Sequence, residues 1–237
     1  MTKQNKYPNT LAVFDLDNTL IDSDAKLKAD FIGAMQRLGI QITPEEARKG
    51  RWYETAKRYG FSQEQFDYSF NQRKTWEQSL KDREVTVFPG TISLLSLLKE
   101  REIKTALLSL SKPSYTDLKL DYLGLRPFFD KVITVTPRKD ATKKYGAFHL
   151  VSEMNPETIE EAYFIGDKLE DVALSRNVQK EFGIESEGIL VDIGRKNGTT
   201  SKYGKGRNRR YYPIVQSLSD IRKHICYNDK DAAEDIS

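Results

Sequence analysis

Four aspartates of this chain lie just beyond short apolar segments. Asp15 and Asp17 follow the first such segment, and Asp167 follows a later one with Asp171 four positions further on. Carboxylates brought together would repel one another and raise one another's pKa unless a cation neutralised them. Magnesium suits such a group because it prefers one or two carboxylates together with water and phosphate oxygens. The spacing therefore predicts a Mg²⁺ site that can accept a phosphate.

Asp15 and Asp17 are close enough to act on one substrate and distinct enough to take separate roles. One aspartate can attack phosphorus and form an acyl phosphate, while a second acid protonates the departing alkoxide and later activates water. Phosphoryl transfer depends chiefly on positioning and on stabilising spread negative charge. A hydroxyl and a lysine aimed at the phosphate oxygens are therefore needed, and Ser109 and Lys144 can supply them.

The elements that must position these residues follow a repeated layout. Apolar runs that predict buried strands alternate with helical patterns, which indicates a parallel sheet with helices on both faces. The predicted strands cover residues 11–14, 103–108, 132–135, 162–165 and 188–191, with a short last one at 211–215. The predicted helices cover residues 91–100, 114–123, 143–154, 169–178 and about 218–226. Ligands of such sheets collect beyond the carboxyl ends of the strands, where the aspartates lie.

One stretch, from about residue 22 to 84, breaks this alternation. It is helix-like, rich in charged and aromatic residues, and contains no convincing strand. Residues 43–46 (Thr-Pro-Glu-Glu) and 62–65 (Ser-Gln-Glu-Gln) have the pattern of capping boxes at helix starts. We therefore predict an α/β catalytic core of residues 1–21 and 86–237 and a helical cap domain of residues 22–85.

The ordered motifs resemble those of the haloacid dehalogenase superfamily. The matching segments are Asp15-Leu16-Asp17-Asn18-Thr19-Leu20, Leu107-Leu108-Ser109, a lysine that opens the helix at 143–154, and Phe164-Ile165-Gly166-Asp167-Lys168-Leu169-Glu170-Asp171. The resemblance spans roughly residues 11–192. The insert is similar in position to the helical cap of the branch that contains phosphoglycolate phosphatase and beta-phosphoglucomutase. It implies a Rossmann-like, doubly wound parallel sheet with an inserted helical cap domain.

The resemblance also implies a role for each matching residue. Asp15 would be the nucleophile and a metal ligand, and Asp17 the general acid and base, with its backbone carbonyl facing the metal. Ser109 would bind phosphate, Asp167 would ligate Mg²⁺, and Asp171 would ligate or support it. A further acid at the position of Asp17 argues against a dehalogenase, because a halide leaves without a proton.

The lysine of the third motif is ambiguous. The segment reads Thr142-Lys143-Lys144-Tyr145-Gly146, without the prolines that are usual in the family. We choose Lys144, because Phe148 and the apolar positions after it then fall in register. Lys168 is a second departure, since a small residue is frequent at its position.

Further substrate contacts are predicted for Ser109, Leu110, Lys112, Thr19 and Arg51. Arg51 belongs to a segment, residues 48–52, that could close over the leaving group or could be an exposed helix end with Trp52 in the core of the insert. Lys112 follows Ser111 in a loop similar to the phosphate-side loop of the mutase branch, or in a solvent-facing turn.

Composition sets the outer bounds. The chain has 237 residues, a formal net charge of +3 and a single cysteine, which excludes an intramolecular disulfide and a zinc site built from cysteines. No secretory signal or membrane-spanning run is evident, so we expect a cytoplasmic protein without a membrane partner. The basic loop at residues 195–210 could neutralise nucleic-acid phosphates, but a solvated loop is the better interpretation, and the small net charge disfavours a nucleic-acid partner. The oligomeric state cannot be read from the sequence.

These observations predict a Mg²⁺-dependent phosphatase that hydrolyses a small-molecule phosphate monoester through an aspartyl phosphate. Two alternatives stay open. A phosphomutase of the beta-phosphoglucomutase type needs the same acids but must shield the aspartyl phosphate from water. A nucleic-acid-associated phosphatase would use the basic loop.

Overall fold

The computed structural model describes residues 7, 9–48, 52–135, 142–193 and 212–226. The chain divides into two compact units, one formed by the chain up to Ile21 together with the chain from Val87 onward, and the other by Asp22–Thr86. The two connections between the units pair as short strands, β2 (Ile21–Asp22) and β3 (Thr86–Val87). Arg51 and the basic loop at 195–210 lie outside the described residues.

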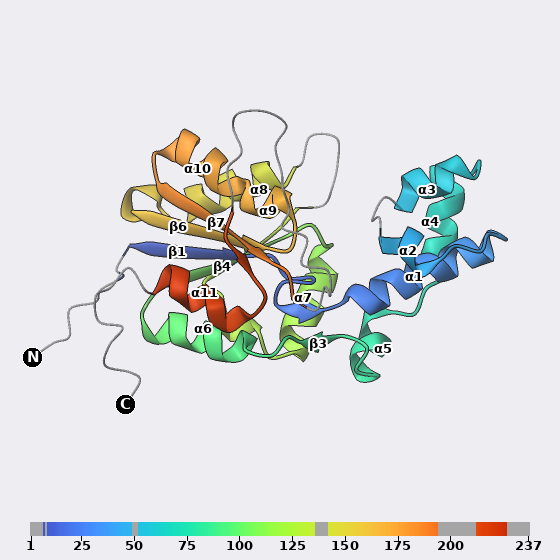
Figure 1. Ribbon diagram of the computed structural model, residues 1–237, viewed down its shortest axis with the longest axis horizontal. Coiled ribbons are helices and arrows are strands. Elements are labelled where there is room, and N and C mark those ends of the chain that lie inside the picture. Colours follow the sequence, from blue (N-terminus) through green and yellow to red (C-terminus); the bar gives the residue numbers. More distant parts are fainter. Residues whose placement is uncertain (1–6, 8, 49–51, 136–141, 194–211, 227–237) are drawn as a thin grey trace, which may run out of the picture. The chain divides into compact units, whose positions relative to one another are not determined.

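A parallel sheet forms the centre of the first unit (Figure 1). Within the described residues it has six strands in the order β5-β4-β1-β6-β7-β8, and every neighbouring pair is parallel. The strands are β1 (Thr10–Phe14), β4 (Lys104–Ser109), β5 (Lys131–Thr134), β6 (Glu161–Gly166), β7 (Glu185–Val191) and β8 (Ile214–Val215). The apolar runs of β1, β4, β6 and β7 are buried on both faces, as expected of a sheet covered on both sides, whereas the outer strands β5 and β8 are less buried. The predicted doubly wound α/β fold is confirmed.

Helices cover both faces of this sheet. Figure 1 shows α8, α9 and α10 on one face, and α6 and α11 packed together on the other. The helices of this unit are α6 (Thr91–Glu100), α7 (Pro113–Tyr122), α8 (Lys143–Glu153), α9 (Leu169–Val172), α10 (Leu174–Phe182) and α11 (Leu218–Ile225), with short 3-10 turns at Arg126–Phe128 and Pro156–Thr158. The helix predicted at 169–178 is divided at Ala173 and extends to Phe182, where Gly183 ends it with a φ of 73°.

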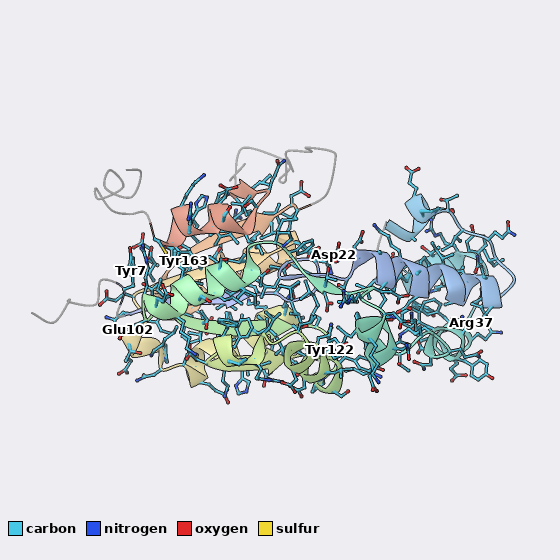
Figure 2. All side chains as sticks on the ribbon, turned by 90° about the horizontal axis from the view of Figure 1, so that it is seen from below. Tyr7, Asp22, Arg37, Glu102, Tyr122 and Tyr163 are labelled. Carbon is cyan, nitrogen blue, oxygen red and sulfur yellow. The ribbon has the colours of Figure 1, made fainter. Side chains whose placement is uncertain are left out.

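The hydroxyl of Tyr7 connects the segment before β1 to the residue that follows α11. It donates a hydrogen bond of 3.0 Å to the carbonyl of Cys226, directly after α11 (Figure 2). Arg101, after α6, donates to the same hydroxyl at 3.2 Å. These contacts lie at the amino-terminal end of β1, opposite to the end that the aspartates follow.

The second unit is helical. It contains α1 (Asp24–Arg37), α2 (Pro44–Arg48), α3 (Trp52–Arg58), α4 (Gln63–Asn71) and α5 (Trp76–Lys81). Both predicted capping boxes are confirmed: Thr43 and Glu46 exchange bonds at the start of α2, and Ser62 and Gln65 do so at the start of α4. The core of this unit is rich in aromatic side chains.

Trp52 lies in that aromatic core. Its ring stacks on Phe31 at a centroid distance of 5.3 Å, and its indole N–H donates to the carbonyl of Ala47. The structure therefore supports the interpretation in which Trp52 packs in the core of the insert.

No helix within the described residues combines the length and the apolar character needed to cross a bilayer.

Gly146 brings α8 close to the sheet. A Cβ atom built there would lie 2.8 Å from Cδ1 of Leu108 and even closer to Val135, so a larger residue would push the helix away. The same helix carries Lys143 one turn earlier, on the same buried face. Gly146 thus controls how deeply that lysine reaches.

We expect Gly146→Ala to lower the free energy of unfolding by about 1–3 kcal/mol, because overpacking outweighs the better helix propensity of alanine. Gly33→Ala is the matched control, since it also lies inside a helix but its Cβ would meet only the flexible guanidinium of Arg37, at 3.4 Å. Thermal unfolding followed by circular dichroism compares the two. A neutral Gly146→Ala would contradict the close approach.

Candidate active site

The register of the sheet brings the predicted residues together at the carboxyl ends of its strands. Phe14 pairs with Leu107 of β4 on one side and with Ile165 of β6 on the other. Asp15 comes directly after Phe14, so it lies level with the ends of both neighbouring strands. The backbone N–H of Asp15 continues the ladder with a 2.9 Å hydrogen bond to the carbonyl of Ile165. The central position of β1 therefore places Asp15 between the Ser109 end and the Asp167 end.

A tight turn follows Asp15 and presents Asp17. Leu16 is fully buried, and its carbonyl accepts hydrogen bonds from the N–H groups of Leu20 and Ile21 at 3.0 and 3.2 Å. Asn18 adopts a φ of 63°, a left-handed conformation that asparagine tolerates better than most residues. The turn buries Leu16 while leaving the side chain of Asp17 19% exposed.

Lys143 is the counter-ion of Asp15. It lies at the start of α8, its side chain is 8% exposed, and its Nζ donates to Oδ1 of Asp15 at 2.6 Å and also to Oδ1 of Asp171. Within the described part of the chain this is the side-chain hydrogen bond that the Asp15 carboxylate receives, and it involves Oδ1 and not Oδ2. One ammonium thus orients two of the four predicted acids.

Asp167 and Asp171 occupy the turn between β6 and α9. Oδ2 of Asp171 accepts a 3.0 Å hydrogen bond from the backbone N–H of Lys168, whose own side chain is exposed. A Cβ on Gly166 would lie 2.5 Å from Cγ of Asp171, so only glycine lets Asp171 fold back over the end of β6. The departure at Lys168 therefore leaves the backbone contact intact.

Asp15, Asp167 and Asp171 form a group that fits a divalent cation. All three are buried, and one ligand oxygen from each lies within 4.8 Å of the others. Three ionised carboxylates beside the single ammonium of Lys143 leave two negative charges in a buried place. Oxygen ligands and this charge match a hard divalent cation such as Mg²⁺. The side chain of Asp17 instead pairs with a lysine, so the structure does not bring that carboxylate into the group.

Burial changes the protonation of these acids. It raises the pKa of Asp15 to about 6, an effect opposed by Lys143 and reinforced by Asp171 and Asp17. Burial likewise raises the pKa of Asp171, against the influence of Lys143. Burial alone would lower the pKa of Lys143, but the two carboxylates outweigh it and raise that pKa above its ordinary value. Lys143 is therefore cationic at neutral pH.

The remaining predicted residues divide into buried and exposed ones. Ser109 ends β4, is 2% exposed, and its Oγ accepts a 3.1 Å hydrogen bond from the N–H of Ser111. Leu110 packs partly buried against the core, and Lys112 is exposed above the ring of Tyr115. Thr19 is fully buried beneath the turn. The predicted contact of Arg51 concerns a residue outside the described ones.

The preference for Lys144 is corrected. Its side chain is exposed, and its Nζ lies 5.2 Å from the centre of the Phe148 ring on the surface of α8. Lys143 points into the site instead, because α8 turns its Lys143 and Gly146 face toward the sheet. The apolar register that favoured Lys144 failed since Phe148 is only partly buried.

A second lysine at the site was missed from the sequence. Lys119 of α7 is fully buried, and its Nζ lies 2.9 and 2.6 Å from the two carboxylate oxygens of Asp17. A lysine within a predicted helix is normally solvated, and no local pattern in residues 113–122 marks Lys119 as an exception.

A cavity of about 410 Å³ is lined by residues of the helical unit, none of which belongs to the group of aspartates described above. Its two lysines already pair with carboxylates that also line it: Lys26 binds Asp30 at 2.8 Å, and Lys74 binds Glu84 at 2.6 Å. A phosphate would have to compete with these carboxylates, so we assign the chemistry to the acids at the edge of the sheet.

Comparison with known proteins places the chain in a family. The family model described as "Haloacid dehalogenase-like hydrolase" matches residues 12–183. The chain therefore belongs to the haloacid dehalogenase-like hydrolases, as its motifs predicted. A proposed pyrophosphatase, PpaX, from Caldanaerobacter subterraneus subsp. tengcongensis is 24% identical over 172 residues, which cover 71% of this chain and 77% of PpaX.

Solved structures share the fold. A predicted phosphatase from Clostridium acetobutylicum gives a TM-score of 0.68 at 20% identity, over 92% of this chain and 98% of its own. A haloacid dehalogenase-like hydrolase from Streptococcus pneumoniae gives 0.67 at 19% identity, over 92% and 99%. A predicted phosphoglycolate phosphatase from Haemophilus somnus gives 0.64 at 15% identity, over 93% and 99%.

Removing the ammonium of Lys143 would leave two buried carboxylates without their counter-ion. We expect Lys143→Met to lower the free energy of unfolding of the metal-free protein by about 3 kcal/mol near pH 7. Lys144→Met is the matched control, and as an exposed substitution it should change this quantity by less than about 0.5 kcal/mol. Denaturant titrations in a chelator measure both. Equal effects of the two substitutions would contradict the placement of Lys143.

Proposed function

We propose that this hydrolase is a Mg²⁺-dependent phosphatase that acts on a small-molecule phosphate monoester through a phosphorylated Asp15. The observation that carries the proposal is the environment of Asp15. Its carboxylate is buried, held through Oδ1 by Lys143, and lies within reach of Asp167 and Asp171. Such a carboxylate has one oriented oxygen and one free to attack, which is what a nucleophile in phosphoryl transfer requires.

The residues of this chain divide the reaction between them. Oδ2 of Asp15 attacks phosphorus while the bond from phosphorus to the leaving oxygen breaks, and Asp17 gives that oxygen its proton. In the second half, Asp17 accepts a proton from water, the water oxygen bonds to phosphorus, and the bond to Asp15 breaks. Ser109 and Lys143 bind phosphate oxygens and hold their charge. When bound, Mg²⁺ neutralises the carboxylate group and the phosphoryl oxygens.

The names of related proteins narrow the choice of substrates to test. The relatives above include a proposed pyrophosphatase and a predicted phosphoglycolate phosphatase. A panel should therefore contain inorganic pyrophosphate, phosphoglycolate, sugar phosphates and a nucleoside monophosphate, each with and without Mg²⁺. Formation of a phosphosugar isomer instead of free phosphate would favour a mutase.

Phosphorylation of Asp15 is testable directly. We expect Asp15→Asn to lower kcat by at least about 10³-fold, because the amide cannot form the acyl phosphate. Acid quenching during turnover, followed by mass spectrometry, should find one added phosphoryl group on the peptide that contains Asp15. Asp130→Asn is the control. Asp130 accepts a hydrogen bond from the N–H of Thr105 near the amino-terminal end of β4, and the side-chain oxygen of asparagine can still accept it. Undiminished turnover by Asp15→Asn would overturn the proposal.

Metal binding should depend on pH. The pKa of Asp15 is raised to about 6 by burial, so at lower pH a proton occupies the carboxylate and must be displaced by the metal. We expect the apparent Mg²⁺ association constant to rise by about tenfold per pH unit below pH 6 and to level off above it. Calorimetry in buffers of different ionisation enthalpy measures both affinity and released protons. Binding that is independent of pH would contradict this.

A further inference from the structure

Lys119 is a fully buried lysine whose ammonium faces the second acid of the site. It lies on α7, three residues before Tyr122, which Figure 2 labels. Nζ of Lys119 donates to Oδ1 and Oδ2 of Asp17 at 2.9 and 2.6 Å, and it lies 3.4 Å from Oγ of Ser111. The same Ser111 hydroxyl donates to Oδ2 of Asp17 at 3.0 Å.

Such a lysine needs a reason to be buried. Moving an ammonium out of water costs several kcal/mol unless a well-aligned partner offsets it. An apolar residue at this position of α7 would avoid that cost, because its neighbours Thr116 and Leu120 are also buried. The contact with both oxygens of Asp17 is therefore the feature that distinguishes Lys119 from a simple packing residue.

The contact also restricts the carboxyl group of Asp17. A carboxylate on a turn can rotate about its χ angles, but donors on both oxygens define the plane in which it lies. Lys119 has no exposed surface of its own, whereas the side chain of Asp17 is 19% exposed. Of the two side chains, Asp17 is therefore the one that a molecule approaching from solvent can touch.

We propose that Lys119 is a positioning residue that orients Asp17 for proton transfer to and from the reacting oxygens. This inference rests on the proposed function, in which Asp17 protonates the leaving oxygen and then accepts a proton from water. Lys119 forms and breaks no covalent bond in either step. Its ammonium holds the carboxyl group in the same place while the proton leaves and returns.

A positioning role differs from a structural one in its dependence on the leaving group. An alkyl phosphate such as glycerol phosphate releases a strongly basic alkoxide and needs a proton, whereas p-nitrophenyl phosphate releases a stable phenolate and does not. The ratio kcat/KM reports the steps up to the first irreversible one, here the departure of this group. A variant in which Asp17 is misplaced should therefore have a lower kcat/KM for glycerol phosphate and a nearly unchanged one for p-nitrophenyl phosphate.

The experiment measures kcat/KM on both substrates for Lys119→Met, Asp17→Asn and the double variant. We expect Lys119→Met to lower kcat/KM on glycerol phosphate by about 10²-fold and on p-nitrophenyl phosphate by less than about threefold, as general acid catalysis contributes about 10²–10⁴-fold. Asp17→Asn should show the same selectivity, and the double variant should be no worse than Asp17→Asn, because the two residues act as one unit. Lys180→Met is the control, because Lys180 is an exposed lysine of α10, and it should leave kcat/KM unchanged for both substrates.

The outcomes separate the two proposals. If Asp17→Asn lowers kcat/KM equally for both substrates, the role of Asp17 in the proposed function is wrong, and the inference about Lys119 is wrong with it. If Asp17→Asn is selective but Lys119→Met slows both substrates equally, Lys119 is structural and the inference alone is overturned. Thermal unfolding checks that each variant folds, and Lys119→Gln, which keeps a donor without the charge, replaces Lys119→Met in the same comparison if that variant does not fold.

Discussion

The concentration of negative charge at one edge of the sheet is the constraint on which the rest of the site depends. A parallel sheet with β1 at its centre brings the carboxyl ends of β1, β4 and β6 together, and the chain places aspartates at two of them. Ionised carboxylates in a buried place are stable only with counter-charge. Lys143 supplies one positive charge, and the remaining negative charge suits a divalent cation.

Two lysines from two helices share the acids of β1 between them. Lys143 of α8 holds Asp15, and Lys119 of α7 holds Asp17. The environments differ accordingly, because Asp15 is buried among further carboxylates while Asp17 is partly exposed beside a hydroxyl. Two chemically identical side chains, two positions apart, can therefore serve as nucleophile and as proton carrier. One strand end can carry both roles because the two carboxyl groups have different neighbours.

Close packing makes these contacts possible. Gly146 lets α8 approach Leu108 and Val135 closely enough for Lys143 to reach Asp15, and Gly166 leaves the space that Asp171 occupies. A methyl group at either position would move a charged side chain as well as an apolar one. Stability and chemistry at this edge of the sheet are therefore set by the same contacts.

The sequence by itself determined the main strands and helices around the sheet, the end of the sheet where the acids lie, and the acids as candidates, because strand and helix periodicity, capping boxes and the order of the motifs are local signals. It did not predict the short strands β2 and β3 or the division of the helix at Ala173. The family followed from Asp15, Asp17, Ser109, Asp167 and Asp171 in that order. Only the tertiary structure decided which lysines meet them. Neighbours in a helix point in directions about 100° apart, so the choice of Lys143 over Lys144 depends on how α8 packs. Lys119 lies 102 positions from Asp17, and no local pattern reports a contact that two separate elements create only when they fold together.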